Sequence, residues 1–215
     1  MRRVSGEPLE PLLGWARFSG LRIVVQPGVF VPRRRTELLA SAALALVAPG
    51  DVVVDLCCGS GAVGAVLLAG AAPIELYLSD IDAGATACAA RNVGDRATVL
   101  TGDLFAPLPR PLMGRIDVLV ANAPYVPTAA IALMPPEARL HEARIALDGG
   151  DDGLDVQRRV VAEAPRWLSP RGTLLVETSE RQAQSTAGLF RASGLEPRVL
   201  RSRRLEATVV AGGRA

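Results

Sequence analysis

A glycine-rich segment, D-L-C-C-G-S-G-A-V-G at residues 55–64, has the composition of a ligand-binding loop. It follows a β-branched run and leads into an apolar run that ends near Gly70, which predicts a loop between a strand and a helix. Small residues let a ligand approach the backbone, and a helix N-terminus offers free N–H groups to a carboxylate or a phosphate. Asp80 ends the next strand-like run, where its side chain can accept hydrogen bonds from both ribose hydroxyls of an adenosine-containing cofactor.

This loop fits two classes of cofactor. Gly59, Gly61 and Gly64, with Asp80 about twenty residues further on, satisfy the dinucleotide fingerprint and so predict a nicotinamide cofactor. The same strand, loop and acidic residue suit S-adenosylmethionine (SAM) equally well. The loop alone leaves both cofactors open, beside a purely structural glycine turn.

A second polar segment, N-A-P-Y at residues 122–125, follows the strand-like run 117–121, at the edge where open α/β sheets bind ligands. Because Pro124 restricts Ala123 to an extended conformation, the Asn122 side-chain oxygen and the Ala123 carbonyl can converge as two acceptors. Two acceptors can hold both hydrogens of a planar NH₂ group and turn its nitrogen toward an electrophile, while Tyr125 lies against the planar group. The alternative is a simple turn with a packing tyrosine.

The segments around these motifs alternate between strand-like and helix-like patterns, which predicts a parallel α/β sheet with right-handed crossovers. We expect strands at 51–56, 74–79, 97–100, 116–121 and 172–177, and helices at 36–47, 83–92, 154–167 and 181–192, with a further helix ending near residue 70. Two strand-like runs with no helix between them, 198–202 and 206–211, predict a late antiparallel pair.

The N-terminal region has a different character. Residues 1–20 are polar and turn-rich, and Pro27-Gly28 lies between the apolar runs 21–26 and 29–31. This arrangement predicts a small hairpin with its turn at Pro27-Gly28.

Composition limits the function classes. The chain has 215 residues, of which 49% are hydrophobic and 21% charged, as expected for one globular domain with a short appendage. Its 24 basic and 22 acidic residues give a net charge of +2, too balanced for a protein that coats DNA. Every basic residue is an arginine, which excludes a lysine nucleophile.

The cysteines do not predict a metal site. Cys57, Cys58 and Cys88 lack the paired spacing of zinc ligands, and the one histidine, His141, is distant in sequence. We expect no metal, free and mostly buried thiols, and His141 as a polar surface residue. Residues 56–74 carry no charge, but their four glycines and Pro73 predict a loop and a packed helix rather than a membrane span. No signal peptide is evident, so a reducing cytoplasm is expected.

The sequence resembles the HemK-like family of SAM-dependent N5-glutamine methyltransferases, which modify release factors and ribosomal proteins. D-L-C-C-G-S-G is similar to the family loop D-L-G-T-G-S-G, and N-A-P-Y is similar to its N-P-P-Y signature. Four more segments follow in family order: G-E-P-L-E-P-L-L-G from residue 6, P-G-V-F-V-P-R-R-R-T-E at 27–37, A-L-D-G-G-D-D-G-L from 146 and L-L-V-E-T from 174. This collinearity over residues 6–210 favours SAM over a nicotinamide cofactor.

The resemblance implies a class I SAM-dependent methyltransferase (Rossmann-like) fold, with a mostly parallel seven-stranded sheet, a C-terminal antiparallel strand pair and a small N-terminal β-hairpin. Residues 1–35 are then the arm with the hairpin, and residues 36–215 are the methyltransferase domain. The expected cofactor-binding residues are Pro32, Arg33, Thr36, Asp55, Cys57, Gly59, Gly61, Asp80, Ile81, Asp103, Leu104 and Asn122.

The resemblance also implies a role for particular residues. Cys57, Gly59 and Gly61 would line the methionine end of SAM, with Asp80 at the ribose and Asp103 near the adenine. The expected catalytic residues are Asn122, Ala123, Pro124 and Tyr125, which would hold the target amide. Positioning then does most of the catalysis, because the sulfonium is a charged leaving group.

The sequence departs from the family pattern at four places. Cys57 replaces a glycine, so this position should not need a positive φ unless the backbone is strained. Ala123 replaces the first proline of N-P-P-Y, which keeps the carbonyl but holds it less firmly. Arg34 and Arg35 replace the Pro and Glu of the family's P-R-P-E-T-E and place positive charge beside the cofactor entrance. The small helical N-terminal domain of the release-factor enzymes is expected to be missing.

Three alternatives to methylation of a protein glutamine remain. RNA adenine is one, since N-P-P-Y-type sites also serve adenine N6-methyltransferases and arginines cluster at 33–35 and at Arg198, Arg201, Arg203 and Arg204, although charge runs are usually solvated faces. A small-molecule amine is the second acceptor. The third is a catalytically silent SAM-binding scaffold, suggested by Cys57, Ala123 and Arg35.

Overall fold

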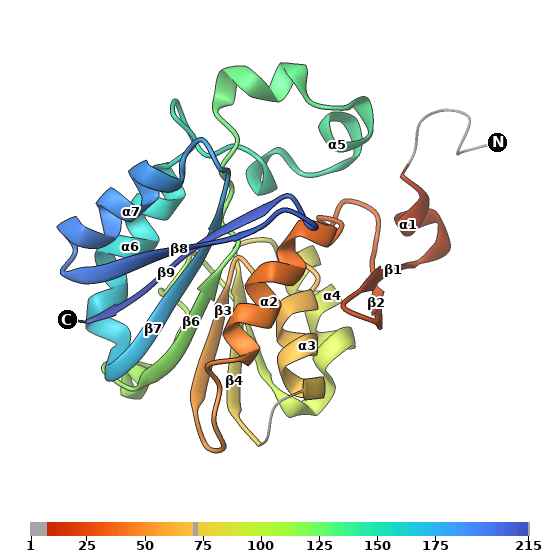
Figure 1. Ribbon diagram of the computed structural model, residues 1–215. Helices are drawn as coiled ribbons and strands as arrows, with labels where there is room; N and C mark the ends of the chain where they lie inside the picture. Colours follow the sequence, from red (N-terminus) through yellow and green to blue (C-terminus); the bar gives the residue numbers. More distant parts are fainter. Residues whose placement is uncertain (1–7, 71–72, 215) are drawn as a thin grey trace.

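The computed structural model describes residues 8–70 and 73–214, and these residues form a seven-stranded sheet of order β5-β4-β3-β6-β7-β9-β8 (Figure 1). The strands are β3 (Val52–Leu56), β4 (Glu75–Asp80), β5 (Thr98–Thr101), β6 (Ile116–Ala121), β7 (Leu168–Thr178), β8 (Leu195–Ser202) and β9 (Ala207–Arg214). β3 to β7 pair in parallel, whereas β9 runs antiparallel to both β7 and β8. The expected fold class, including the late antiparallel pair, is confirmed.

Helices cover both faces of this sheet. The α-helices are α1 (Leu9–Leu13), α2 (Glu37–Leu44), α3 (Ala62–Gly70), α4 (Ala83–Val93), α5 (Pro136–His141), α6 (Asp155–Trp167) and α7 (Ala183–Ala192). Short 3₁₀ helices are η1 (Arg34–Thr36), η2 (Gly94–Arg96), η3 (Arg110–Leu112), η4 (Thr128–Leu133) and η5 (Arg144–Ala146). None of the described helices is long and apolar enough to cross a membrane.

Side chains alternate between the two faces of the sheet along each strand, and each face has its own apolar core. Val53 of β3 packs in a cluster with residues of α2, α3 and α4, whereas its neighbours Val52 and Val54 pack with residues of α6 and α7. Successive strand side chains point to opposite faces, so a continuous apolar run such as 52–56 is the pattern of a strand covered on both sides. The buried sheet leaves its carboxyl edge as the place where polar chemistry can gather.

The hairpin lies elsewhere than expected. Its strands are β1 (Trp15–Phe18) and β2 (Leu21–Val24), joined by Ser19-Gly20 with φ values of +47° and +82°. A two-residue hairpin turn favours positive φ, which proline cannot adopt, so the prediction of a hairpin turn at Pro27-Gly28 was wrong. Gly28 instead forms a parallel bridge with Glu142.

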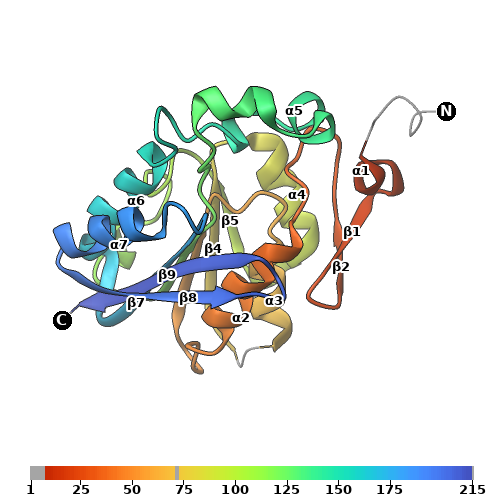
Figure 2. The same ribbon diagram turned by 45° about the horizontal axis from the view of Figure 1, so that its top comes forward.

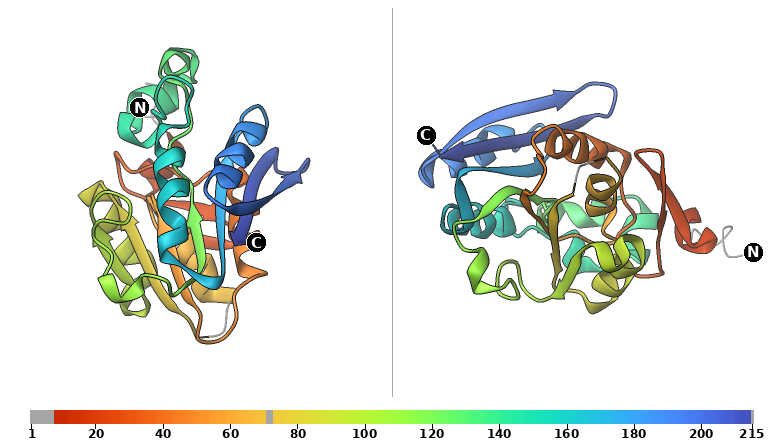
Figure 3. Two further views of the ribbon diagram at one scale, coloured as in Figure 1. Left: turned by 90° about the vertical axis from the view of Figure 1, so that its left-hand side faces the viewer. Right: turned by 90° about the horizontal axis from the view of Figure 1, so that it is seen from below.

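The N-terminal arm is more ordered than a polar, turn-rich segment, because it holds both α1 and β1; residues 1–7 lie outside the described part. The hairpin stands beside α3 and α4 at one side of the molecule (Figure 3). Phe18 and Ile23 are buried in the same cluster as α2 and α3. The division into residues 1–35 and 36–215 stays a prediction, and the arm shares the main core.

Asn92 of α4 ties the arm to the glycine-rich loop. Its Oδ1 accepts the Val24 backbone N–H at 2.8 Å, and its Nδ2 donates to the carbonyls of Val24 at 2.9 Å and Ser60 at 2.8 Å. One side chain therefore completes the backbone hydrogen bonding of an arm strand and of the loop.

Replacing this side chain tests the link. We expect Asn92→Ala to lower the free energy of unfolding by about 2 kcal/mol, since it leaves partly buried backbone groups unpaired. The exposed neighbour Arg91→Ala is the control and should change it by less than about 0.5 kcal/mol. Urea unfolding measures the free energy of unfolding of both variants. Equal decreases in the two variants would contradict the proposed link.

Candidate active site

A cavity of about 590 Å³ opens at the carboxyl edge of β3, β4 and β6. This volume suits a cofactor-sized ligand. Its walls come from the β3–α3 loop, the end of β4, residues 122–126 and parts of two segments, 28–36 and 134–147. The second segment belongs to residues 127–150, a long connection that carries η4, α5 and η5 and lies over this edge of the sheet (Figure 2).

The cavity gathers nearly all of the residues expected from the sequence. The residues that line it include Pro32, Arg33, Thr36, Asp55, Cys57, Gly59, Asp80, Ile81, Asp103, Leu104, Asn122, Ala123, Pro124 and Tyr125. Gly61 was expected there but does not line the cavity. A Cβ on Gly61 would lie 2.9 Å from the Cβ of Ala89, so this glycine is required for close packing of the loop against α4.

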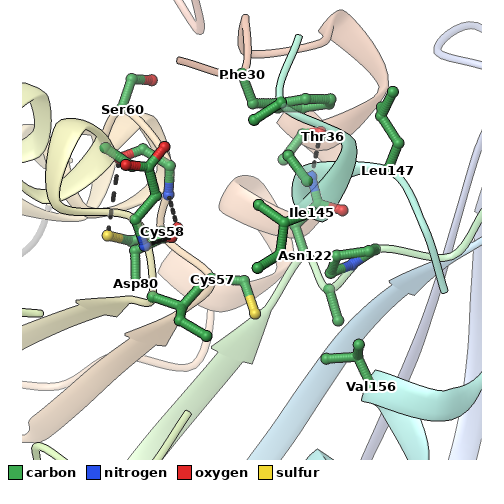
Figure 4. A pocket seen from close by; sticks show the side chains of 18 of the residues that line it. Phe30, Thr36, Cys57, Cys58, Ser60, Asp80, Asn122, Ile145, Leu147 and Val156 are labelled. Carbon is green, nitrogen blue, oxygen red and sulfur yellow. Dashed lines mark hydrogen bonds between the residues drawn. The ribbon is translucent and has the colours of Figure 1, made fainter. Parts of the chain in front are cut away.

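Asp80 organises the loop on one side of the cavity (Figure 4). Its Oδ2 accepts the backbone N–H of Gly59 at 2.8 Å, and its Oδ1 accepts that of Asp82 at 3.0 Å. A carboxylate has about four lone-pair sites, so both oxygens keep capacity for further donors. The same side chain can therefore hold the loop and bind hydroxyl groups of a ligand.

Cys57 has a left-handed backbone conformation, with φ of +54°. The replacement of glycine therefore did not remove the need for a positive φ, and the structure keeps the strained alternative that the sequence left open. Such a conformation costs roughly 1 kcal/mol for a residue with a Cβ. Burial, and secondarily the charges of Asp80 and Asp55, raise the pKa of the Cys57 thiol, so it stays neutral and unreactive.

The cysteines and the histidine do not form a cluster in the structure. All three cysteines are free, with Cys58 and Cys88 buried and Cys57 partly buried. His141 is partly buried in α5 rather than fully on the surface, and it does not line the cavity. In the described ranges, no group of three or more His, Cys, Asp or Glu side chains is arranged as a metal site.

Asp55 is a carboxyl group buried beneath the loop. It is 2% exposed, and its Oδ2 accepts the Gly64 N–H at 3.3 Å. Desolvation raises its pKa from 3.8 to about 7; the Gly64 bond opposes this rise and the charge of Asp80 adds to it. Because its folded-state pKa is above the unfolded value, the folded protein binds this proton more tightly.

A pH series tests this assignment. Between about pH 4 and pH 7, Asp55 loses its proton in the unfolded state but keeps it in the folded state. As the pH rises through this range, the free energy of unfolding of the wild type should therefore fall by a few kcal/mol relative to that of Asp55→Asn. Urea unfolding of both proteins from pH 4 to pH 8 measures the difference. Asp95→Asn, which removes an exposed carboxyl, is the control. A constant difference between wild type and Asp55→Asn would contradict the assignment.

The opposite side of the cavity holds the N-A-P-Y segment (Figure 4). Asn122 Nδ2 donates to the Thr36 hydroxyl at 3.3 Å, which turns Oδ1 away from Thr36. Within the part of the chain that the structure describes, neither Asn122 Oδ1 nor the Ala123 carbonyl accepts a hydrogen bond. Two neighbouring oxygen acceptors are therefore free on residues that line the cavity.

Tyr125 is fixed from two directions. Its hydroxyl donates to Glu177 Oε1 at 3.2 Å, and its carbonyl accepts Gln182 Nε2 at 3.0 Å. A Cβ on Gly153 would lie 2.4 Å from the Tyr125 carbonyl oxygen. The D-G-G-D-D-G-L segment thus lets the chain pass close against N-A-P-Y.

Two important glutamates were missed by sequence reasoning. Glu177 lies in the apolar second half of β7, residues 173–178, where one charged residue among apolar and threonine residues was an available signal. Glu142 carried no local signal, because it lies in an irregular connection between α5 and η5. Both are nearly inaccessible to solvent, Glu177 at 2% and Glu142 at 8%.

Glu142 connects the 127–150 connection to the arm. The Arg33 guanidinium donates to both Glu142 oxygens, at 2.6 and 2.7 Å, and lies over the Phe30 ring. The Val31 N–H also donates to Glu142. Burial raises the pKa of Glu142, and Arg33 acts against that rise. Arg33 therefore lines the cavity as one half of an internal ion pair.

Removing Arg33 tests this connection. We expect Arg33→Ala to lower the free energy of unfolding by about 2 kcal/mol, below the value for a fully buried pair because Arg33 is 33% exposed. Residues 127–150 should also become more sensitive to limited proteolysis. Arg34→Ala, at an exposed neighbour, should change neither property. Equal behaviour of the two variants would rule out the structural role of the pair.

Comparison with known proteins agrees with this geometry. Residues 20–151 match the family model "Methyltransferase small domain". The release factor glutamine methyltransferase of Geobacter sulfurreducens is 40% identical over 196 residues, which cover 90% of this chain and 68% of the relative. The 4-amino-L-phenylalanine/4-methylamino-L-phenylalanine methyltransferase of Streptomyces pristinaespiralis is 38% identical, covering 90% and 68%.

Solved structures show the same fold. A methyltransferase from Pyrococcus furiosus superposes with a TM-score of 0.67 at 15% identity, covering 90% of this chain and 89% of that one. The fold, the position of the cavity at the carboxyl edge and the sequence matches all point to a methyltransferase. The chain belongs to the release factor glutamine methyltransferase family and is a SAM-dependent methyltransferase.

Proposed function

We propose that this protein transfers a methyl group from SAM to the side-chain amide nitrogen of a glutamine in a protein, with a release factor as the leading substrate. The observation that carries the proposal is the pair of free acceptors on residues that line the cavity, Asn122 Oδ1 and the Ala123 carbonyl. A primary amide has two N–H donors in one plane, which matches two fixed acceptors.

The residues of the cavity fit SAM chemically. Asp80 and Asp103 contribute carboxyl groups to the cavity wall, beside Asp55, whose burial raises its pKa to about 7. SAM carries a sulfonium, an ammonium and ribose hydroxyls, all of which favour carboxylates as partners. Its own carboxylate requires donors, which the backbone of the glycine-rich loop at the start of α3 can supply. We propose that Asp80 holds the ribose, that Cys57 and Gly59 border the methionine end, and that Asp103 lies near the adenine.

The chain's contribution to the reaction is positional. When bound, SAM supplies an electrophilic methyl carbon on a positively charged leaving group. Asn122 Oδ1 and the Ala123 carbonyl accept the two amide hydrogens, which directs the nitrogen toward that carbon. Tyr125 lies against the amide plane, held by its bond to Glu177. As methylation makes the nitrogen acidic, no general base is required.

The relatives' names support the glutamine acceptor. Seven of the bacterial relatives, at 36–40% identity, are named release factor glutamine methyltransferases. Their matches cover 85–90% of this chain. A ribosomal protein, the other protein substrate expected from the sequence, has no comparable support.

A small amine is the second candidate acceptor. The relative from Streptomyces pristinaespiralis, named for an aromatic amino acid amine, matches this chain as extensively as the glutamine methyltransferases do. Arg35 is exposed and also lines the cavity, where it could bind the carboxylate of a free amino acid. RNA has less support, because the exposed arginines 198, 201, 203 and 204 lie on the edge strand β8 and its turn and do not line the cavity.

Transfer of radiolabelled methyl from SAM tests the proposal. The purified protein is incubated with a bacterial lysate that is then separated into protein, RNA and small-molecule fractions. We expect label in a protein band, identified as a release factor, that digests to N5-methylglutamine. A recombinant release factor with the labelled glutamine changed to asparagine should lose the label.

The other outcomes are equally informative. Label confined to amino acids would favour the amine acceptor, and label confined to RNA would favour a nucleobase. No label in any fraction, with SAM bound, would favour the catalytically silent scaffold. Each of these three results would contradict glutamine methylation.

A further inference from the structure

Arg159 of α6 forms an ion pair with Asp103 in the wall of the cavity. Its Nη2 donates to Asp103 Oδ2 at 2.6 Å, and both residues line the cavity. The pair joins two segments 56 residues apart in sequence, the turn after β5 and the first part of α6. In the described part of the chain, no hydrogen bond reaches the other carboxylate oxygen, Asp103 Oδ1.

The turn that carries Asp103 is held in place by its neighbours. The Gly102 N–H donates to the carbonyl of Asp80 at 2.9 Å, and the Ser79 hydroxyl donates to the carbonyl of Leu104 at 2.8 Å. Leu104 is 7% exposed and has a φ of +49°, which is rare for a residue with a bulky side chain. Such a conformation persists only where the surrounding structure fixes it. Asp103 therefore has a fixed backbone position beside Asp80.

The first turns of α6 carry two arginines with different surroundings. Val156 and Arg159 are three residues apart, so they lie on one face of the helix, and both line the cavity. Arg158 bonds to the carboxylates of Asp152 and Asp155 and does not line the cavity. Only the second arginine of the pair thus faces the cofactor-sized space.

The strand order gives the direction of a bound cofactor. Strands β5, β4, β3 and β6 are neighbours, and the segments after their carboxyl ends carry, in that order, Asp103, the end residue Asp80, Cys57 and Asn122. Asp80 and Asn122 lie on opposite sides of the cavity (Figure 4). With the ribose at Asp80 and the methyl group near Asn122, the base of SAM extends toward β5. Asp103 follows that strand.

The ion pair leaves one acceptor for this base. A guanidinium has only donors, and Arg159 engages Oδ2, so Oδ1 keeps its lone pairs for another donor. The exocyclic amino group of adenine is such a donor. The side chains of Arg159 and Asp103 are 56% and 46% exposed, so the pair contributes little to stability. Its main effect is to fix which oxygen of Asp103 is free.

We propose that Arg159 is a positioning residue for the cofactor: it holds Oδ2 of Asp103, so that Oδ1 accepts the exocyclic amino group of adenine. The inference rests on the proposed place of the SAM adenine beside Asp103. It assigns the selection of adenine to a contact between the β5 turn and α6 rather than to Asp103 alone.

Binding of two demethylated cofactors to the purified protein tests the proposal. S-adenosylhomocysteine has the adenine amino group, whereas S-inosylhomocysteine has a carbonyl oxygen in its place. By calorimetry, we expect the wild type to bind the adenosyl compound about 30-fold more tightly, as for one hydrogen bond to a charged group. Arg159→Met should reduce this ratio of Kd values about fivefold, because the freed carboxylate can rotate.

The matched control is Arg158→Met, which removes the neighbouring arginine and its ion pairs outside the cavity. It should keep the wild-type ratio of Kd values within a factor of about two. Thermal unfolding of both variants monitors folding. An unchanged ratio in Arg159→Met, or an equal decrease in Arg158→Met, would overturn the proposal.

Asp103→Asn tests the orientation directly. Because Arg159 can only donate, it should bind the oxygen of the introduced amide and leave the NH₂ group facing the cavity. That group can donate to the carbonyl of S-inosylhomocysteine, so we expect this variant to prefer the inosyl compound. In Asp103→Asn/Arg159→Met the amide is free to turn, and the inverted preference should be lost. A preference that does not invert, or that stays inverted in the double variant, would contradict the role of Arg159.

These binding measurements do not depend on the methyl acceptor. If the ratios change as expected but no glutamine is methylated, the proposed function fails and the role of Arg159 stands. If glutamine is methylated and Arg159→Met keeps the wild-type ratio, the role of Arg159 fails alone. With an active acceptor, Arg159→Met should raise the KM of SAM about fivefold and leave kcat unchanged, a split that a general loss of folding would not produce.

Discussion

The hydrogen bond from the Asn122 amide to the Thr36 hydroxyl is the contact on which the proposed acceptor site depends. It joins the end of β6 to η1, which is the start of the first long helix after the arm. Without it, the Asn122 amide could turn and offer N–H groups to a substrate that itself donates N–H groups. The end of β6 and η1 therefore have to meet at one point for the proposed chemistry to work.

Apolar surface buried in the two cores stabilises the fold that brings these elements together. Strands β3, β4, β6 and β7 are covered on both faces, so their carboxyl ends form a firm edge. Polar groups are concentrated at that edge: Asp55 and Glu177 are almost inaccessible, and burial raises the pKa of each. The connection 127–150 then lies over the edge, joined to the arm by Arg33 and Glu142. Stability built in the two cores thus supports strained or desolvated groups at the site.

The sequence was most informative where function needs a local pattern. The glycine-rich loop, Asp80 and N-A-P-Y could be placed at one sheet edge because strand periodicity fixes where parallel strands end. The hairpin turn was misplaced because Pro27-Gly28 is a stronger turn signal than Ser19-Gly20, although only the latter has the required backbone conformation. Glu142 and Glu177 could not be assigned roles, since their partners Arg33 and Tyr125 are distant in sequence.

The most direct test of the central claim compares SAM binding and methyl transfer in Asn122→Ala. If Asn122 acts on the acceptor, the single-turnover rate of methyl transfer should fall on the order of 100-fold, as when one polar contact to a reacting group is removed from an enzyme. The Kd of SAM, measured by calorimetry, should change less than threefold. An unchanged transfer rate, or a loss that is fully explained by weaker SAM binding, would contradict the account.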